Sequence, residues 1–158
     1  MPHAPGYVGV VGPSGVADDA LLTTAEELGR RLAEAGAVVV TGGGAGVMEA
    51  ASRGASLVGG TVLGILPGSD RREGNPHLTV AVATGLGEMR NALLVRSVDV
   101  LVAVGGSWGT LSEVALACRT GVPAYAVGGW ALPEGGGPVA VPDAEAAVTR
   151  ALAHLTHD

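Results

Sequence analysis

Short apolar runs alternate with stretches of helical periodicity along most of the chain. Six runs rich in valine, leucine and alanine predict buried strands, and most are bounded by glycine, proline or polar residues. Between them apolar residues recur at helical spacing, and Asp143 can cap a last helix that ends near Leu155. The alternation predicts an α/β fold: a doubly wound, mainly parallel sheet of about six or seven strands with helices on both faces. The predicted strands are residues 7–12, 37–41, 61–66, 78–84, 100–104 and 123–127.

The length of the chain sets the scale of this fold. Its 158 residues suffice for one buried core, so we expect a single domain over residues 1–158. Hydrophobic residues make up 47% of the chain, yet no apolar run approaches the roughly 20 residues that cross a bilayer. The first residues lack the basic and apolar segments of a secretory signal. We therefore expect a cytoplasmic protein with no membrane partner.

Charge and titratable residues narrow the possible chemistry. The net charge is −6, and all nine positive residues are scattered arginines, so nucleic acid is not an expected partner. The absence of lysine excludes a P-loop. The four histidines show no metal-ligand spacing, and we expect no metal site. The single cysteine, Cys118, falls within a helical pattern and is expected to be a small apolar residue of the interior.

Three glycine-rich turns, residues 12–15, 42–46 and 105–109, follow predicted strands. Ligands of parallel sheets bind beyond the carboxyl ends of strands, and a helix start presents unpaired N–H groups to a phosphate. We expect the turns to line one site for a small phosphorylated ligand, with the phosphate on residues 106–110. Glycine also serves tight turns and close packing in any such fold, which is the alternative interpretation. The candidate ligand-binding residues are Gly12, Ser14, Gly42, Gly43, Gly44, Met48, Asn91, Gly105, Gly106, Ser107, Trp108, Gly109 and Thr110.

Two charged residues are candidates for catalysis. Thr110 and Glu113 have the spacing of a capping box, which would explain both without a ligand. The Glu113 carboxylate would also lie beside the anion site, where it could stabilise positive charge on a sugar ring. Arg90 is predicted at a helix start, where a cation is unfavourable, and this favours a role at the ligand. Trp108 could stack on a base or cover the glycine turn.

Residues 105–109 also match the G-x-S-x-G nucleophile motif of serine hydrolases. Asp143 and His154 follow Ser107 in the chain order of a catalytic triad. However, the chain is short for that hydrolase fold, and His154 lies four residues from the end of the sequence. A serine hydrolase is therefore the weaker alternative.

Three motifs in order resemble the Lonely Guy superfamily of Rossmann-like proteins. They are TGGGAGVMEA at residues 41–50, GEMRNA at residues 87–92 and GGSWGTLSE at residues 105–113. The resemblance implies a homodimer or higher homo-oligomer that cleaves the N-glycosidic bond of a nucleoside 5′-monophosphate. It places Glu113 and Arg90 in the positions of the catalytic glutamate and arginine.

The chain departs from the family signature PGGxGTxxE at two positions. Gly105 stands in place of the proline and Ser107 in place of the second glycine, while Asn91 replaces a common lysine of the active enzymes. In these details the chain is more similar to short bacterial members and to molybdenum cofactor carrier proteins. The alternative to a hydrolase is thus a carrier without turnover, and a nucleotide-sensing dimer is a third possibility. The expected ligand is an AMP-like nucleotide or a molybdopterin-type cofactor.

Overall fold

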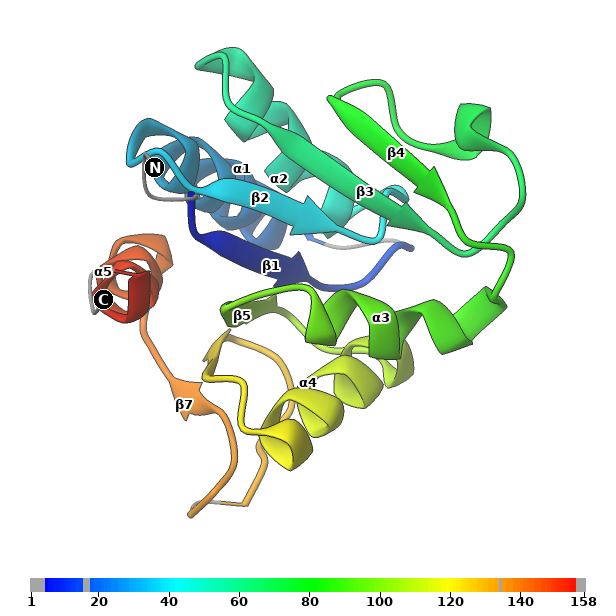
Figure 1. The fold of residues 1–158 in the computed structure, drawn as a ribbon. Coiled ribbons are helices and arrows are strands. Elements are labelled where there is room, and N and C mark those ends of the chain that lie inside the picture. Colours follow the sequence, from blue (N-terminus) through cyan, green and yellow to red (C-terminus); the bar gives the residue numbers. More distant parts are fainter. Residues whose placement is uncertain (1–4, 16–17, 134, 156–158) are drawn as a thin grey trace.

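Seven parallel strands form a single sheet in the computed structural model, which describes residues 5–15, 18–133 and 135–155. Figure 1 shows this sheet with helices on both sides. The strand order is β4-β3-β2-β1-β5-β6-β7. The strands are β1 (Tyr7–Val11), β2 (Val38–Thr41), β3 (Val62–Leu66), β4 (Val80–Ala83), β5 (Val100–Val104), β6 (Ala124–Val127) and β7 (Val139–Ala140).

Two groups of helices bury the two faces of the sheet. One face packs against α1 (Asp19–Glu34), α2 (Val47–Leu57) and α5 (Ala144–Leu155), and the other against α3 (Arg90–Arg96) and α4 (Trp108–Thr120). Figure 1 shows α3 and α4 in front of the sheet and α1 and α2 behind it. Because the central strands are covered twice, β5 is buried along its whole length, which explains its unbroken apolar sequence.

The helices α1 and α2 approach each other closely through two glycines. A Cβ atom at Gly29 would overlap the carbonyl oxygen of Ala51, and one at Gly54 would overlap that of Glu26. At the edge of this contact the Arg53 Nε donates to the Glu26 carboxylate over 2.8 Å. Small residues therefore let this pair of helices lie backbone to backbone on the sheet.

The predicted α/β fold is confirmed. All six predicted strands exist, with ends that differ by up to two residues, and the Asp143 carboxylate caps α5 by accepting from the Ala146 N–H at 2.8 Å. The short strand β7 lies within the glycine- and proline-rich residues 130–142 and was not among the predicted strands. The helix α3 is only seven residues long and follows a 3₁₀ turn, Gly87–Met89. Among the described residues no helix is both long and apolar enough to cross a membrane.

Candidate functional site

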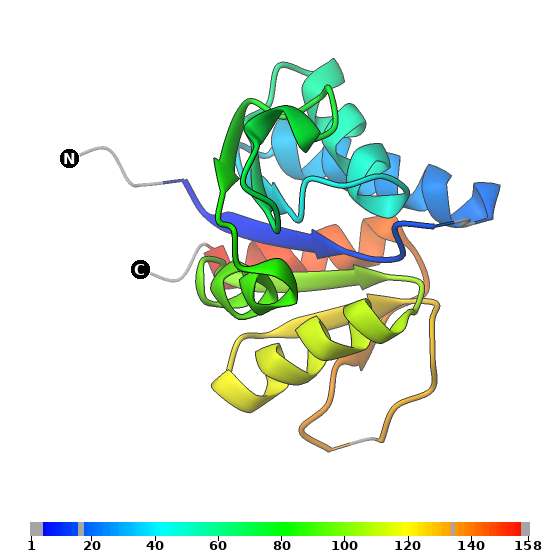
Figure 2. The same ribbon diagram turned by 90° about the vertical axis from the view of Figure 1, so that its right-hand side faces the viewer.

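The carboxyl ends of β1 and β5 mark the point where the strand order reverses. The chain proceeds from β1 outward to β4 in one direction, and from β5 outward to β7 in the other. In Figure 2 the arrowheads of β1 and β5 point to the same edge, where α4 begins. Ligands of doubly wound folds bind in the crevice at such a reversal. This edge is therefore the candidate site.

The three predicted glycine turns meet at this edge, around Pro13. The Val47 N–H donates to the Pro13 carbonyl at 3.0 Å, and a Cβ atom at Gly46 would overlap that same oxygen. On the other side, a Cβ atom at Gly105 would lie 3.3 Å from the Pro13 Cδ. The sheet thus brings together segments that are about 90 residues apart in the sequence.

The start of α4 differs from the sequence expectation. The helix begins at Trp108, and Ser107 is its N-cap: its Oγ accepts from the Thr110 N–H at 3.2 Å and lies 2.9 Å from the Thr110 Oγ1. The capping box of Thr110 and Glu113 is therefore wrong, because Ser107 has the extended backbone of a cap and Thr110 already lies in the first turn. Within the part of the chain that is described, the N–H groups of Trp108 and Gly109 have no acceptor.

Because the helix begins at Trp108, Glu113 does not take part in a capping box, and helix capping does not explain it. Its side chain is only 9% exposed, and none of the hydrogen bonds among the described residues involves its carboxylate. Burial raises the pKa of Glu113 from 4.5 to about 7, and the positive charge of Arg90 opposes this rise. A buried carboxyl group that titrates near neutral pH is typical of a functional site.

Arg90 spans the ends of two neighbouring strands. Its Nη1 donates to the carbonyl oxygens of Gly42, at 2.8 Å, and Ile65, at 3.0 Å. A Cβ atom at residue 42 would overlap the guanidinium group, so the glycine there makes room for Arg90. The pKa of Arg90 is lowered, because the effect of burial exceeds the opposing effect of the negative charge of Glu113. The buried Nε has no hydrogen-bond partner among the described residues, so its N–H is available as a donor.

Met48 and Asn75 contact the glycine turn after β2 from two sides. The Met48 side chain lies over this turn, and a Cβ atom at Gly44 would lie 2.7 Å from its Cε. Asn75 was not predicted, because no motif or spacing marks it. Its N–H donates to the Gly43 carbonyl at 2.8 Å and its Nδ2 to the Gly44 carbonyl at 3.1 Å. The turn is thus held by α2 on one side and by the loop before β4 on the other.

The remaining predicted residues differ in their surroundings. Asn91 is buried, and its Nδ2 donates to the Ser112 Oγ at 3.0 Å, which joins α3 to α4. Gly12 allows the end of β1 to pack against the Val104 carbonyl of β5. Ser14 is exposed beside Gly46. Asn91 and Gly12 therefore contribute to the framework of the site, and Ser14 lies at its surface.

A fourth glycine turn lies after β6 at the same edge and was not predicted from the sequence. Gly128 and Gly129 have φ angles of 67° and 89°, and Gly129 packs against the Gly105 carbonyl. The turn places the Trp130 ring over Gly106, where a Cβ atom would lie 3.1 Å from the indole. The sequence held a signal for this turn, since a strand followed by Gly-Gly occurs both at residues 104–106 and at residues 127–129.

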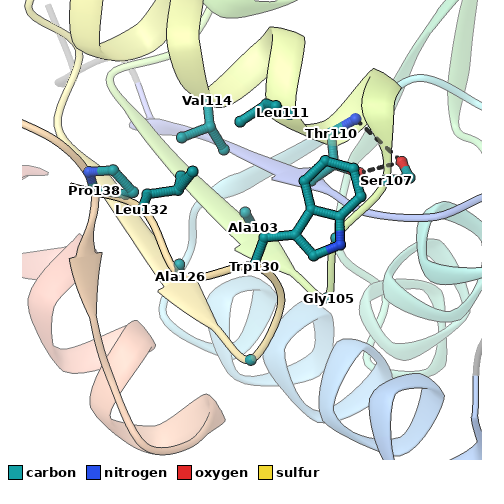
Figure 3. Close-up of a pocket in the computed structure, with 12 residues that line it drawn as sticks. Ala103, Gly105, Ser107, Thr110, Leu111, Val114, Ala126, Trp130, Leu132 and Pro138 are labelled. Atoms are coloured by element: carbon teal, nitrogen blue, oxygen red, sulfur yellow. Dashed lines mark hydrogen bonds between the residues drawn. The ribbon is translucent and has the colours of Figure 1, made fainter.

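A small apolar hollow with a cavity volume of about 20 Å³ lies between α4 and the segment after Trp130. Figure 3 shows Leu111 and Val114 of α4 facing Leu132 and Pro138, with the Trp130 indole beside the start of the helix. Every residue that lines it is uncharged, and neither Arg90 nor Glu113 is among them. The hollow and the charged pair are thus separate parts of one edge.

The proposed catalytic triad is wrong. The Ser107 hydroxyl is bonded to Thr110, and the Asp143 carboxylate caps α5. The His154 Nε2 lies 2.6 Å from the Tyr125 hydroxyl. His154 belongs to the end of α5, next to Leu155, which packs against Gly6 before β1 at the opposite edge of the sheet.

Two other chemistries find no support in the described residues. Among them no three metal-ligating side chains lie together in a group that could hold a metal ion. The Cys118 thiol is partly buried, and burial raises its pKa, so the thiol stays protonated at neutral pH. The candidate chemistry therefore rests on the glycine turns, on the neighbouring indoles of Trp108 and Trp130, and on the charged pair of Arg90 and Glu113.

Comparisons with known proteins agree with this architecture. The model of the SLOG cluster4 family matches residues 6–149. The chain belongs to the SLOG cluster4 family. The predicted resemblance to the Lonely Guy superfamily is thereby confirmed. A relative of this SLOG protein from Archaeoglobus fulgidus is described only as an uncharacterized protein. It is 40% identical over 116 residues, which cover 72% of this chain and 74% of the relative.

Two solved structures resemble the SLOG protein over nearly their whole length. The molybdenum cofactor binding protein of Rippkaea orientalis is 32% identical with a TM-score of 0.89, and the match covers 97% of this chain and 99% of that one. The molybdenum cofactor carrier protein of Chlamydomonas reinhardtii is 32% identical with a TM-score of 0.86, over 98% of this chain and 100% of that one. Both share the seven-strand α/β architecture of this chain.

Proposed function

We propose that this SLOG protein binds a molybdopterin-type cofactor, a pterin that carries a phosphate group, and carries it without turnover. The full-length similarity to two proteins named for molybdenum cofactor binding or carriage is the observation behind this proposal. A carrier must hold its cargo reversibly and shield it. Hydrogen bonds to the phosphate and contacts with the ring meet that need without a protein ligand to the metal.

The residues at the start of α4 fit a phosphate. The N–H groups of Trp108 and Gly109 are free of protein acceptors in the described chain, and the Ser107 and Thr110 hydroxyls lie beside them. A helix N-terminus attracts an anion through these groups and through the helix dipole. Because the whole chain carries a net charge of −6, local donors of this kind must supply the attraction.

The second candidate function is hydrolysis of the N-glycosidic bond of a nucleoside 5′-monophosphate. It is favoured by Glu113, which is buried beside Arg90 and has no capping role. As a carboxylate, Glu113 would stabilise the oxocarbenium-like transition state, and Arg90 would orient the ribotide. Water would add to the sugar, and the free base and ribose 5-phosphate would leave.

The two functions are distinguished by incubating the protein with neopterin monophosphate and, separately, with AMP. Carriage is expected to give saturable calorimetric binding of neopterin monophosphate, a rise in the melting temperature, and recovery of the unchanged pterin by chromatography. Free adenine from AMP, lost in Glu113→Gln, would instead favour the hydrolase. If the protein neither binds neopterin monophosphate nor releases adenine, both functions are contradicted.

A matched variant tests the phosphate position in the same assay. Gly109 is exposed in the first turn of α4, and a Cβ atom there would meet only the Ser107 Oγ, at 3.9 Å. The substitution Gly109→Asp places a carboxylate where the helix dipole stabilises it but where it repels a phosphate. We expect binding to be lost while the melting temperature of the free protein does not fall.

We also propose that the protein forms a homodimer through the face that carries α3. Val80 and Val82 of β4 are exposed and share a sheet face with Leu63 and Ile65, their partners in register on β3, which pack in the α3 and α4 core. On α3 and the turn before it, three more apolar side chains are exposed: Leu86, Met89 and Leu93. Exposed apolar side chains gathered on one face mark an interaction surface, and the same face of a second copy would cover them.

Light scattering is expected to give twice the chain mass of 15.4 kDa. The double substitution Met89→Glu and Leu93→Glu should give a monomer, because both side chains are exposed and the charges would face each other across the interface. The substitution Leu57→Glu, at an exposed apolar residue on the other face, serves as the control. A monomeric wild-type protein would contradict the proposal.

A further inference from the structure

We propose that Trp108 and Trp130 form a wall that binds the planar ring of the phosphorylated ligand on the β6 side of α4, away from Glu113. The inference rests on the proposed phosphate position at the start of α4. The two indoles come from the first turn of α4 and from the turn after β6, and their ring centroids lie 4.8 Å apart with an interplanar angle of 73°. We call this pair the tryptophan wall.

The tryptophan wall is exposed although its side chains are the largest in the chain. Trp108 is 78% exposed and Trp130 45% exposed, and they are the two tryptophans of the sequence. An indole that packs into no core loses the hydrophobic stabilisation that its size offers. Two such rings beside a group of free N–H donors are the arrangement that binds a flat ring attached to a phosphate.

The backbone holds the Trp130 half of the wall in place. Trp130 follows two glycines with positive φ angles, and Gly129 packs against the Gly105 carbonyl. Its indole lies over Gly106, in the turn that leads into α4. Figure 3 shows the ring beside Ser107 and Thr110 at the start of the helix. The ring is therefore positioned by the same turn that presents the phosphate donors, and little ordering is needed when a ligand binds.

The order of the strands separates the tryptophan wall from the charged pair. Along the carboxyl edge the strands follow one another as β3, β2, β1, β5 and β6. Arg90 bonds to the Gly42 carbonyl after β2 and to the Ile65 carbonyl of β3, whereas Trp130 follows β6. The start of α4, which follows β5, lies between them. A ligand held there by its phosphate can extend toward either side.

The side that the ring takes decides the chemistry. A ring on the tryptophan wall directs the bond between ring and sugar away from the Glu113 carboxyl, and the ligand is held without cleavage. The adjoining hollow is lined only by uncharged residues, with the Ser107 and Thr110 hydroxyls at its polar end. These surroundings suit an uncharged fused heteroaromatic ring, such as a pterin, and disfavour a ring that carries a charge.

Titration calorimetry with two probes tests the tryptophan wall. Neopterin monophosphate carries the ring, and ribose 5-phosphate lacks it. In Trp108→Leu and Trp130→Leu the dissociation constant of neopterin monophosphate is expected to rise about tenfold, a factor typical of one lost stacking contact. The dissociation constant of ribose 5-phosphate should stay unchanged. Tryptophan fluorescence of the wild-type protein should be quenched by the pterin and not by ribose 5-phosphate.

Further variants separate failure of the tryptophan wall from failure of the proposed function. Gly109→Asp should weaken the binding of both probes, because it acts on the phosphate. If neopterin monophosphate binds equally well to the tryptophan variants and more weakly to Glu113→Gln, the ring lies on the Arg90 side and the wall is overturned. If neither probe binds the wild-type protein, the proposed phosphate site is wrong, and the proposed role of the tryptophan wall is contradicted as well.

Discussion

Replacing Gly54 with alanine is expected to lower the free energy of unfolding by about 3 kcal/mol, although alanine is the better helix former. A Cβ atom at residue 54 would overlap the Glu26 carbonyl oxygen of α1 and would lie 3.0 Å from the backbone nitrogen of Arg30. Both contacts are with backbone, so the strain cannot be relieved by turning a side chain. The helices α1 and α2 would have to separate. Urea denaturation of the two proteins measures the change.

A glycine in another helix provides the control. Gly109 also lies in a helix, but a Cβ atom there would meet only the Ser107 Oγ, at 3.9 Å. Gly109→Ala is therefore expected to leave the stability unchanged or to raise it by up to about 1 kcal/mol. Gly29→Ala should resemble Gly54→Ala, since its Cβ atom would overlap the Ala51 carbonyl oxygen. Equal stability of Gly54→Ala and the wild-type protein would contradict the close approach of the helices.

Glu113→Gln is expected to be more stable than the wild-type protein by about 3 kcal/mol at pH 8 and equally stable at pH 4. Burial raises the pKa of Glu113 from 4.5 to about 7 in the folded protein. Below pH 4.5 the carboxyl group is protonated in both states and costs nothing. Between pH 4.5 and 7 the unfolded chain releases its proton and the folded chain retains it, so stability falls. Above pH 7 the full cost is present, and the uncharged amide avoids it.

The measurement is a series of urea denaturations between pH 4 and pH 8. Glu88→Gln is the control, because Glu88 is an exposed carboxylate on the same side of the sheet, in the turn before α3. Its curve should run parallel to that of the wild-type protein. If the wild-type protein and Glu113→Gln lose the same stability with rising pH, the burial of Glu113 does not carry the cost described above.

A gain in stability on removing Glu113 would have a functional meaning. A buried carboxyl group that destabilises the folded protein at neutral pH is retained for a reason other than folding. Glu113 makes no cap, and its neighbour Arg90 has a buried Nε without a partner in the described chain. We propose that the pair interacts with a ligand, either as the hydrolase chemistry requires or at one end of the proposed cofactor site.

The sequence by itself determined six of the seven strands, with ends that lie within two residues of those observed. Apolar runs such as Val100–Val104 predict buried strands because both faces of a parallel sheet are covered, and glycine marks the turns that follow. These signals act between neighbours in the chain. The prediction was wrong at the start of α4, because Ser107 and Thr110 are both residue types that cap helices. The extended backbone at Ser107 makes this residue the cap.

Only the tertiary structure decided which side chains meet at the carboxyl edge. Arg90 donates to the carbonyl oxygens of Gly42 and Ile65, which lie 48 and 25 positions before it in the sequence. The Trp130 ring contacts that of Trp108 from the turn after β6. No local pattern specifies such contacts, because they depend on the order in which the strands lie in the sheet. The same order places His154 at the far edge and removes the triad that the linear motif suggested. A linear motif can therefore predict where a turn lies, but the sheet decides what faces it.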